Sequence, residues 1–228
     1  MKKIVVLTGA GVSAESGIPT FRDAGGLWEG YKIEDVASPI GWNKDFKMVL
    51  NFYNLRRAGI RNVEPNEAHI HLAKLEGKYQ VTIITQNIDD LHERGGSSEV
   101  IHLHGEIFKA RSTKDSNLIY NLGDADIFPG DLCEKGSQLR PHIVWFGEEV
   151  PMISKAIPIV SDADIIMVVG TSMLVYPAAG LLNYAPMNVP IYFVDPNIPD
   201  HLPKRNLICI ADKASIAVPM LVKKLMEN

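Results

Sequence analysis

The feature that most constrains the fold lies at the start of the chain, where a short apolar run leads into a glycine-rich turn. Ile4 to Thr8 is mostly β-branched and shows no polar alternation, which is typical of a strand buried on both faces. Gly9-Ala10-Gly11-Val12-Ser13-Ala14 follows and fits the pattern G-x-G-x-x-G/A. In that pattern a helix N-terminus presents backbone N–H groups to a pyrophosphate. The segment predicts an α/β sheet and favours a dinucleotide ligand, although any tight strand-to-helix turn also uses glycine.

Further apolar runs and helical patterns alternate along the chain. The other expected buried strands are Val81 to Thr85, Asp164 to Gly170 and Ile191 to Asp195. The expected helices are Lys44 to Arg57, Asn66 to Gly77, Tyr176 to Tyr184 and Ala214 to Met226. This alternation predicts a Rossmann-type parallel sheet with helices on both faces.

Two stretches do not fit the alternation. Residues 28–69 are mostly helical and supply no expected strand, and residues 106–140 are polar and punctuated by glycine. We therefore expect residues 1–27, 70–105 and 141–228 to form the sheet domain. Residues 28–69 and 106–140 are expected to form a small lobe from two insertions.

Composition excludes several classes of protein. The 228 residues carry a net charge of −4, so no strong cationic field favours nucleic acid or an anionic membrane as a partner. The two cysteines, Cys133 and Cys209, are too few for a disulfide-rich secreted scaffold. The first apolar run stops at Leu7, which is too short for a signal sequence or a membrane span. We expect a cytoplasmic protein.

A dense polar cluster follows the strand that ends at Thr85. Gln86, Asn87 and Asp89 lie at the carboxyl end of a parallel strand, the edge where open α/β sheets bind ligands. Their side chains suit ribose hydroxyls and a carboxamide. In the alternative interpretation, Asn87 or Asp89 caps the next helix.

Two histidines lie in the expected strand Val100 to Glu106. Period-two geometry predicts that His102 and His104 share one face. A histidine pair could be half of a metal site, but no third ligand stands at a recognisable spacing. His104 precedes a glycine at the end of the strand, where an imidazole can act as a general base near neutral pH.

The segment after the glycine-rich turn differs from that of a dehydrogenase. Thr20 to Gly26 is loop material where a second strand would be expected. This loop carries Phe21 and Arg22 and could fold over a bound cofactor. An ordinary surface connection is the alternative.

Five motifs, in order along the chain, carry a resemblance to a known family: Gly9-Ala10-Gly11-Val12-Ser13-Ala14-Glu15-Ser16-Gly17-Ile18-Pro19-Thr20-Phe21-Arg22, Thr85-Gln86-Asn87-Ile88-Asp89, His104-Gly105, Pro141-His142-Ile143-Val144-Trp145-Phe146-Gly147-Glu148 and Gly170-Thr171-Ser172. The chain resembles the sirtuins, which are NAD-dependent protein lysine deacylases. The resemblance implies that NAD meets an acyl-lysine peptide and is consumed. The acyl oxygen attacks the ribose carbon that bears nicotinamide, and the acyl group leaves on ADP-ribose.

The resemblance also implies roles for individual residues. His104 would be the base that activates a ribose hydroxyl, Asn87 would order the ribose and a water, and Asp89 would hold the carboxamide. The residues implied to bind NAD are Gly9, Ala10, Gly11, Ser13, Ala14, Phe21, Arg22, Gln86, Asn87, Ile88, Asp89, Gly170, Thr171, Ser172, Asn197 and Ala214. The residues implied to pair with the substrate peptide as an added strand are Val144, Trp145, Phe146, Gly147 and Glu148.

The chain departs from the family pattern at its zinc positions. Many members hold a structural zinc with two C-x-x-C pairs in the second insertion, and the corresponding residues here are Ser112, Asp115, Cys133 and Gly136. Only one thiolate of four is present, so we expect no zinc. A structural zinc contributes an apparent ~10–16 kcal/mol, which packing or a tied-down loop must replace.

A second departure concerns the acyl group. Tyr53 and Arg56 are three residues apart in an expected helix and would share a face. The pair is similar to the Tyr-x-x-Arg of sirtuins that remove malonyl, succinyl and glutaryl groups, in which a guanidinium binds the distal carboxylate. The alternative is that Arg56, with Arg57 and Arg61, belongs to a solvated basic helix face and that Tyr53 packs in the lobe.

The sequence leaves two other functions open. ADP-ribosyl transfer from the same activated NAD differs only in the group that attacks the ribose carbon. A non-catalytic sensor of NAD or ADP-ribose is the other alternative, and it would not need His104.

Overall fold

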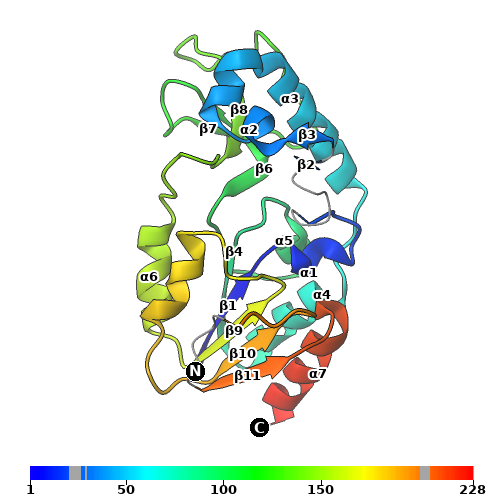
Figure 1. The fold of residues 1–228 in the computed structure, drawn as a ribbon, viewed down its shortest axis with the longest axis vertical. Coiled ribbons are helices and arrows are strands. Elements are labelled where there is room, and N and C mark those ends of the chain that lie inside the picture. Colours follow the sequence, from blue (N-terminus) through cyan, green and yellow to red (C-terminus); the bar gives the residue numbers. More distant parts are fainter. Residues whose placement is uncertain (21–26, 29, 201–205, 228) are drawn as a thin grey trace. The chain divides into compact units, whose positions relative to one another are not determined.

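The computed structural model describes residues 1–20, 27–28, 30–200 and 206–227. They form two compact units (Figure 1). The first unit contains Met1–Pro19, Glu64–Leu103 and Val150–Asn228, and the second contains Thr20–Val63 and His104–Glu149.

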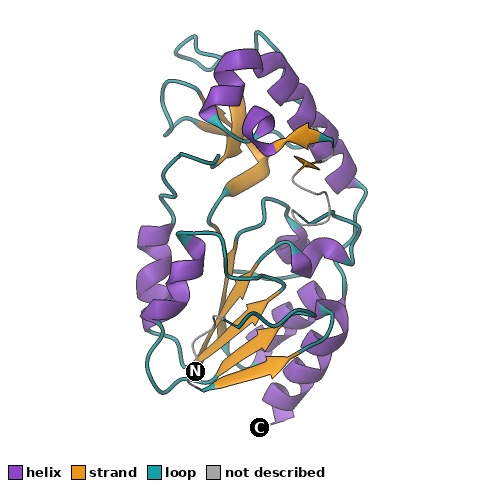
Figure 2. Cartoon of the chain, viewed as in Figure 1, coloured by secondary structure: helices purple, strands orange, loops and turns teal. Residues whose placement is uncertain are grey.

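The apolar runs of the sequence form one parallel sheet in the first unit (Figure 2). Its strand order is β11-β10-β9-β1-β4-β5, and each neighbouring pair is parallel. The strands are β1 (Lys3–Thr8), β4 (Gln80–Thr85), β5 (Val100–His102), β9 (Ile165–Val169), β10 (Ile191–Val194) and β11 (Leu207–Ile210). The predicted α/β class with a parallel sheet is confirmed. β11 was not expected, although Leu207-Ile208-Cys209-Ile210 is a short apolar run.

Helices cover both faces of this sheet because its strands are apolar on both sides. On one face β1 and β4 pack against α4 (Glu67–Lys74) and α7 (Ala214–Glu227). On the other face they pack against α6 (Ile153–Ser161) and the 3-10 helix η2 (Ala178–Tyr184), coloured yellow in Figure 1. The remaining short helices of this unit are α1 (Gly11–Ala14), η1 (Leu75–Gly77) and α5 (Leu91–Arg94).

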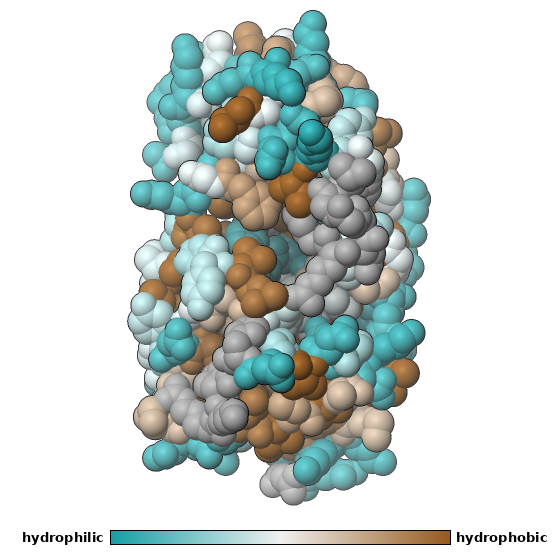
Figure 3. Space-filling view, in the orientation of Figure 1, coloured by the Kyte–Doolittle hydropathy of each residue, from teal (hydrophilic) through white to brown (hydrophobic). Residues whose placement is uncertain are grey.

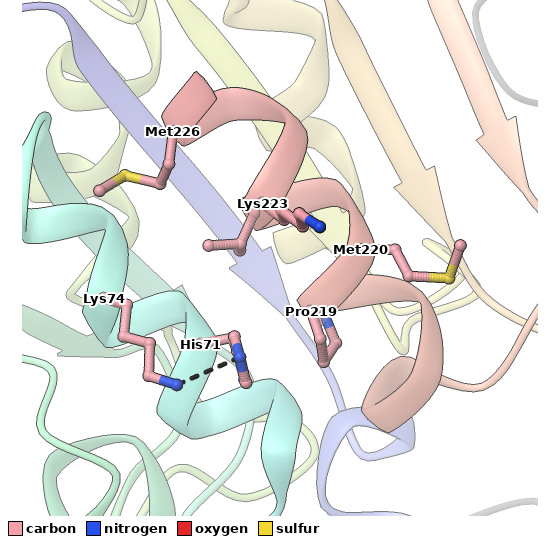
Figure 4. Close-up of a pocket in the computed structure, with 7 residues that line it drawn as sticks. His71, Lys74, Pro219, Met220, Lys223 and Met226 are labelled. Carbon is pink, nitrogen blue, oxygen red and sulfur yellow. Dashed lines mark hydrogen bonds between the residues drawn. The ribbon is translucent and has the colours of Figure 1, made fainter. Parts of the chain in front are cut away.

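The surface of the two helices α4 and α7 is shallowly hollowed where they meet (Figure 4). Pro219, Met220 and Met226 of α7 line the hollow together with His71 and Lys74 of α4. On the face shown in Figure 3, hydrophilic and hydrophobic side chains are interspersed, and the hydrophobic ones form several patches. Among the residues described, no helix combines the length and the apolar character that crossing a membrane requires.

The second unit combines helices with a small antiparallel sheet. Its helices are α2 (Ile33–Val36) and α3 (Pro39–Arg61), and α3 has a kink at Asp45. A three-stranded sheet of order β7-β6-β8 contains β6 (Gly105–Ser112), β7 (Ile119–Asn121) and β8 (Leu139–Ile143). β2 (Leu27–Trp28) and β3 (Tyr31–Lys32) form a two-stranded antiparallel pair.

Two predictions about these segments are wrong. Residues 28–69 do contain a strand, since β3 pairs with β2. The expected strand Val100 to Glu106 is two strands, because β5 ends at His102 and β6 begins at Gly105 in another sheet. His102 and His104 therefore do not share a face of one strand. The cause is Gly105, whose φ of +81° turns the chain between the two sheets.

The residue ranges of the two units also differ from those expected for the sheet domain and the small lobe. Residues 141–149 lie in the second unit, since β8 pairs with β6. Residues 64–69 lie in the first unit, where α4 packs into the core beside α7.

Candidate functional site

The glycine-rich turn after β1 lies against the turn after β9. A Cβ on Gly9 would approach Cβ of Thr171 to 2.6 Å, and one on Gly11 would approach Cα of Gly170 to 2.8 Å. Gly170 itself has a φ of +62°. These glycines are therefore needed for contact between the two turns, before any ligand is considered.

Three backbone N–H groups of this turn already donate to carbonyl oxygens of the protein. The N–H groups of Gly11, Val12 and Ser13 donate to the carbonyl oxygens of Gly170, Gly9 and Ala10. The prediction that the start of α1 binds a pyrophosphate stays a prediction, and these three N–H groups have partners within the protein. They have these partners because α1 has only four residues and its turn closes on itself.

The predicted polar residues of two neighbouring strand ends meet in a buried cluster. The hydroxyl of Ser13 donates to Oδ2 of Asp89 at 3.2 Å and accepts from Nδ2 of Asn87 at 3.1 Å. All three side chains are buried. Burial raises the pKa of Asp89, against the lowering effect of hydrogen bonds from the Leu91 amide and Ser13. Asp89 also accepts from the Leu91 amide at 3.2 Å, so it does contribute to the start of α5 as well.

His69, which no pattern in the sequence singled out, supports this cluster from α4. Its Nδ1 accepts from the N–H of Asn66 at 3.2 Å, so the ring hydrogen lies on Nε2, 3.4 Å from the hydroxyl of Ser13. Burial lowers the pKa of His69 to about 4, which keeps the ring neutral. Asn66 caps α4, and a histidine three residues after such a cap was the available signal.

A second buried histidine lies beside His69. The rings of His69 and His92 are 4.9 Å apart, and Nε2 of His92 lies 2.9 Å from the hydroxyl of Thr8. Burial lowers the pKa of His92 well below its ordinary value, and the neighbouring His69 and His102 lower it further. Both rings are therefore neutral at pH 7.

His102 is hydrogen-bonded into this framework. Its Nδ1 lies 3.0 Å from the carbonyl oxygen of Asn87, and its Nε2 lies 2.7 Å from Oε1 of Glu93. Both partners are hydrogen-bond acceptors, and the two contacts fix the orientation of the ring. It thereby fixes the main chain of Asn87. No group of three or more His, Cys, Asp or Glu side chains within the described ranges is arranged to hold a metal ion.

The other residues implied to bind NAD occupy loops at the same edge of the sheet. Nε2 of Gln86 donates to the hydroxyl of Thr171 at 3.1 Å, which joins the loops after β4 and β9. Asn197 is exposed after β10, and Ala214 begins α7. Ala14 and Ile88 lie in the loops already described, and Ser172 follows Thr171. Phe21 and Arg22 lie outside the described residues.

In the second unit, His104 lies immediately before β6. Its carbonyl oxygen accepts from the N–H of Val144 at 2.9 Å, and its side chain is half-buried. A Cβ on Gly105 would come within 2.0 Å of the carbonyl oxygen of His142. Residue 105 must therefore be glycine for His104 to keep this position.

Tyr53 and Arg56 are both buried in the second unit, with exposed fractions of 0% and 6%. Nε1 of Trp145 donates to the phenol oxygen of Tyr53 at 3.0 Å. The guanidinium of Arg56 lies 5.8 Å from the ring centroid of Phe52, which also packs edge-on against Tyr53. Burial raises the pKa of Tyr53, so its hydroxyl stays protonated.

The segment Val144–Glu148 uses most of its amide groups internally. The N–H groups of Val144, Trp145, Phe146 and Glu148 all donate to acceptors in the same unit. The carboxylate of Glu148 accepts hydrogen bonds from Arg140 and Arg111. The side chain of Glu148 is thus held within the unit, and pairing of the segment's main chain with a substrate peptide stays a prediction.

Ser112, Asp115, Cys133 and Gly136, which the resemblance places at zinc-ligand positions, lie in a hydrogen-bonded region of the second unit. The hydroxyls of Ser112 and Ser137 lie 2.7 Å apart, and Sγ of Cys133 lies 3.1 Å from the Ser137 hydroxyl. Hydrogen bonds from Ser112 and Ser137 lower the pKa of Cys133 to about 6. Nearby, Nζ of Lys135 pairs with Asp115 at 2.6 Å.

Comparisons with known proteins point to one family. The Sir2 family model matches residues 9–177. A protein of Helicobacter pylori (strain ATCC 700392 / 26695) named NAD-dependent protein deacylase is 54% identical over 228 residues, with 100% of this chain and 99% of the relative covered. A Bacteroides thetaiotaomicron protein of the same name is 48% identical over 231 residues, with 99% of each covered.

Solved structures give the same result. The crystal structure of a Sir2 homologue in complex with NAD has a TM-score of 0.88 and 41% identity, with 99% of this chain and 90% of that chain covered. A mutant Sir2 homologue in complex with ADP ribose has a TM-score of 0.90 and 40% identity, with 99% and 92% covered.

Proposed function

The chain belongs to the Sir2 family, and from this premise we propose that it removes acyl groups from protein lysines while consuming NAD. The products are nicotinamide, O-acyl-ADP-ribose and the free lysine. The observation that carries the proposal is the buried cluster of Ser13, Asn87 and Asp89 at the carboxyl ends of β1 and β4. Open α/β sheets bind their ligands at that edge.

The donors and acceptors of this edge suit NAD. Gln86, Asn87 and Thr171 offer neutral amide and hydroxyl groups for ribose oxygens, and Asp89 offers a carboxylate for an amide N–H. NAD, when bound, supplies the ribose carbon to which the acyl group is transferred. We expect Asn87 to order that ribose and Asp89 to hold the carboxamide, while His102 and Ser13 keep both residues in place.

His104 is the proposed general base for the ribose hydroxyl. A neutral imidazole has one ring nitrogen without a hydrogen, which can accept the proton of a hydroxyl. General-base catalysis contributes typically 10²–10⁴-fold, so roughly that loss is expected without the imidazole.

The segment Val144–Glu148 is the proposed partner of the substrate peptide. Four of its amides already donate within the unit. Because a carbonyl oxygen has two lone pairs, we expect the peptide to bind mainly through its own N–H groups and the carbonyl oxygens of this segment. Such pairing through the main chain tolerates varied peptide sequences.

We further propose a preference for acidic acyl chains such as succinyl and malonyl, with acetyl also accepted. Its support is the burial of Arg56 beside Tyr53, since a buried guanidinium binds a carboxylate far better than a solvated one.

The test is product analysis with NAD and matched acetyl-, succinyl- and malonyl-lysine peptides. Mass spectrometry should detect acyl-ADP-ribose and free lysine, and His104→Ala should lower the rate by the factor given above. ADP-ribosylated protein without deacylated peptide would support ADP-ribosyl transfer instead. Binding of NAD without any turnover would support a sensor.

A further inference from the structure

A compact cluster of charged side chains holds the end of the segment Val144–Glu148. Arg140, on β8, binds Glu148 through two hydrogen bonds, Nη1 to Oε1 at 2.6 Å and Nη2 to Oε2 at 3.1 Å. Arg111, on β6, adds a third hydrogen bond to Oε2 at 3.1 Å. The side chains of Arg140, Arg111 and Glu148 are only 10%, 14% and 20% exposed. We call these three residues the clasp.

The clasp encloses Trp145. The guanidinium carbon of Arg140 lies 3.3 Å from the centroid of the indole ring, and Nη2 of Arg140 also donates to the carbonyl oxygen of Ile143 at 3.0 Å. Oε2 of Glu148 accepts from the main-chain N–H of Trp145 at 2.8 Å. Both the ring and the backbone of Trp145 are therefore fixed by the clasp.

Trp145 in turn contacts Tyr53, the tyrosine proposed to lie beside the acyl chain. Its indole N–H donates to the phenol oxygen of Tyr53 at 3.0 Å, and the two rings are stacked with centroids 6.4 Å apart. Trp42 packs against the indole at 5.6 Å. Because Trp145 donates to Tyr53, the phenol oxygen is an acceptor in this contact, and its O–H is directed elsewhere.

A buried ion pair of this kind is weak evidence for stability. The cost of desolvating the charges often equals their attraction, and apolar replacements are frequently neutral or stabilising. The two-pronged contact of Arg140 with a carboxylate instead provides geometric precision. The cluster is thus better suited to fixing the conformation of Val144–Glu148 than to raising the free energy of unfolding.

We propose that the clasp positions Val144–Glu148 for binding of the substrate peptide, and that Trp145 determines acyl-chain specificity by orienting Tyr53. The side chain of Glu148 thereby positions the segment, while the main chain of the segment contacts the peptide. The inference rests on the proposed deacylase function and adds to it the residues that set peptide affinity and acyl preference.

Steady-state kinetics of the full chain tests the clasp. Glu148→Gln and Arg140→Lys should each raise the KM for succinyl-lysine and acetyl-lysine peptides by about tenfold or more, because a charge-assisted contact is lost. The kcat and the KM for NAD should stay within about twofold, since neither reacting group is touched. Arg111→Lys keeps a charge at the single contact and should be milder. Lys44→Gln, which breaks an exposed ion pair with Asp35 in the same unit, is the control.

A second variant tests the link to Tyr53. Trp145→Phe removes the indole N–H but keeps an aromatic ring, and it should lower the ratio of succinyl to acetyl kcat/KM about fivefold. An unchanged ratio overturns the specificity role of Trp145.

Other results of these measurements would contradict the positioning role or the proposed function itself. Wild-type peptide KM in both clasp variants overturns the positioning role. Parallel loss of kcat, NAD binding and thermal stability overturns it too, since that pattern indicates a structural role only. If either variant does not fold, Arg111→Lys and the remaining variant carry the same test. Wild-type protein without any deacylation would instead refute the proposed function.

Discussion

The arginines of α3 illustrate how burial separates residues that look alike in the sequence. Arg57 is fully buried, and it donates from Nε to the carbonyl oxygen of Ile107 at 2.9 Å and from Nη1 to Asn54 at 2.8 Å. Burial lowers the pKa of Arg57, opposed by its ion pair with Asp126. Arg56 is almost as deeply buried, so the interpretation of Arg56 and Arg57 as a solvated basic face is wrong.

Replacement of Arg56 by methionine tests the proposed acyl preference. Arg56→Met keeps an unbranched side chain but removes the charge, so we expect desuccinylation to fall roughly 10- to 150-fold. Deacetylation should fall far less because an acetyl group has no carboxylate. Matched succinyl and acetyl peptides provide the measurement. Arg61→Met, on the same helix, is the control, and equal losses on both substrates would exclude a carboxylate contact.

At the scale of elements, the junction of β5 and β6 decides the position of His104. Gly105→Ala would place a Cβ within 2.0 Å of the His142 carbonyl oxygen at a φ of +81°. We expect the free energy of unfolding to fall by at least about 2 kcal/mol, measured by urea denaturation. Gly59→Ala, on α3, is the matched control, since a Cβ at that position would have no other atom within 4 Å. That variant should gain about 0.5–1 kcal/mol.

The burial of His69 on α4 and of His92 on α5 predicts that the free energy of unfolding depends on pH. The pKa of His69 falls from 6.5 unfolded to about 4 folded, so folding favours the neutral ring. The stability that the neutral ring contributes is fully present above about pH 6.5. As the pH falls from 6.5 toward 4, the free energy of unfolding decreases by about 3 kcal/mol. His92 acts in the same direction.

Urea denaturation of wild type and His69→Gln between pH 7.5 and pH 4 measures this effect. The difference in unfolding free energy between the two proteins should shrink as the pH falls. A difference independent of pH would exclude the buried neutral ring as its cause.

For the molecule as a whole, the second unit holds its outer loops without the thiolates of the family's zinc site. Ser112, Ser137 and Cys133 form one hydrogen-bonded group, and Lys135 places a positive charge beside Asp115. We expect purified protein to contain no stoichiometric zinc and a chelator to leave its thermal midpoint unchanged. Elemental analysis and thermal denaturation measure both. About one equivalent of zinc, removable with loss of folding, would contradict the prediction.

The sequence by itself determined the α/β class, the family and the placing of polar residues at strand ends. These features are local: apolar runs, a glycine-rich turn, and motifs that lie within a few residues of each other. Helical spacing also predicted that Tyr53 and Arg56 share a face, and their role toward an acyl chain stays a prediction.

Only the tertiary structure showed which backbone amides and side chains already have hydrogen-bond partners within the protein. The amides after β1 and in Val144–Glu148 are committed to neighbours that the motifs themselves do not reveal, and Glu148 is held by Arg111 and Arg140. The contact of His69 with Ser13 could not be read from the sequence for the same reason, since it joins residues 56 positions apart. Burial and hydrogen bonding depend on the assembled fold, and no local pattern reports them.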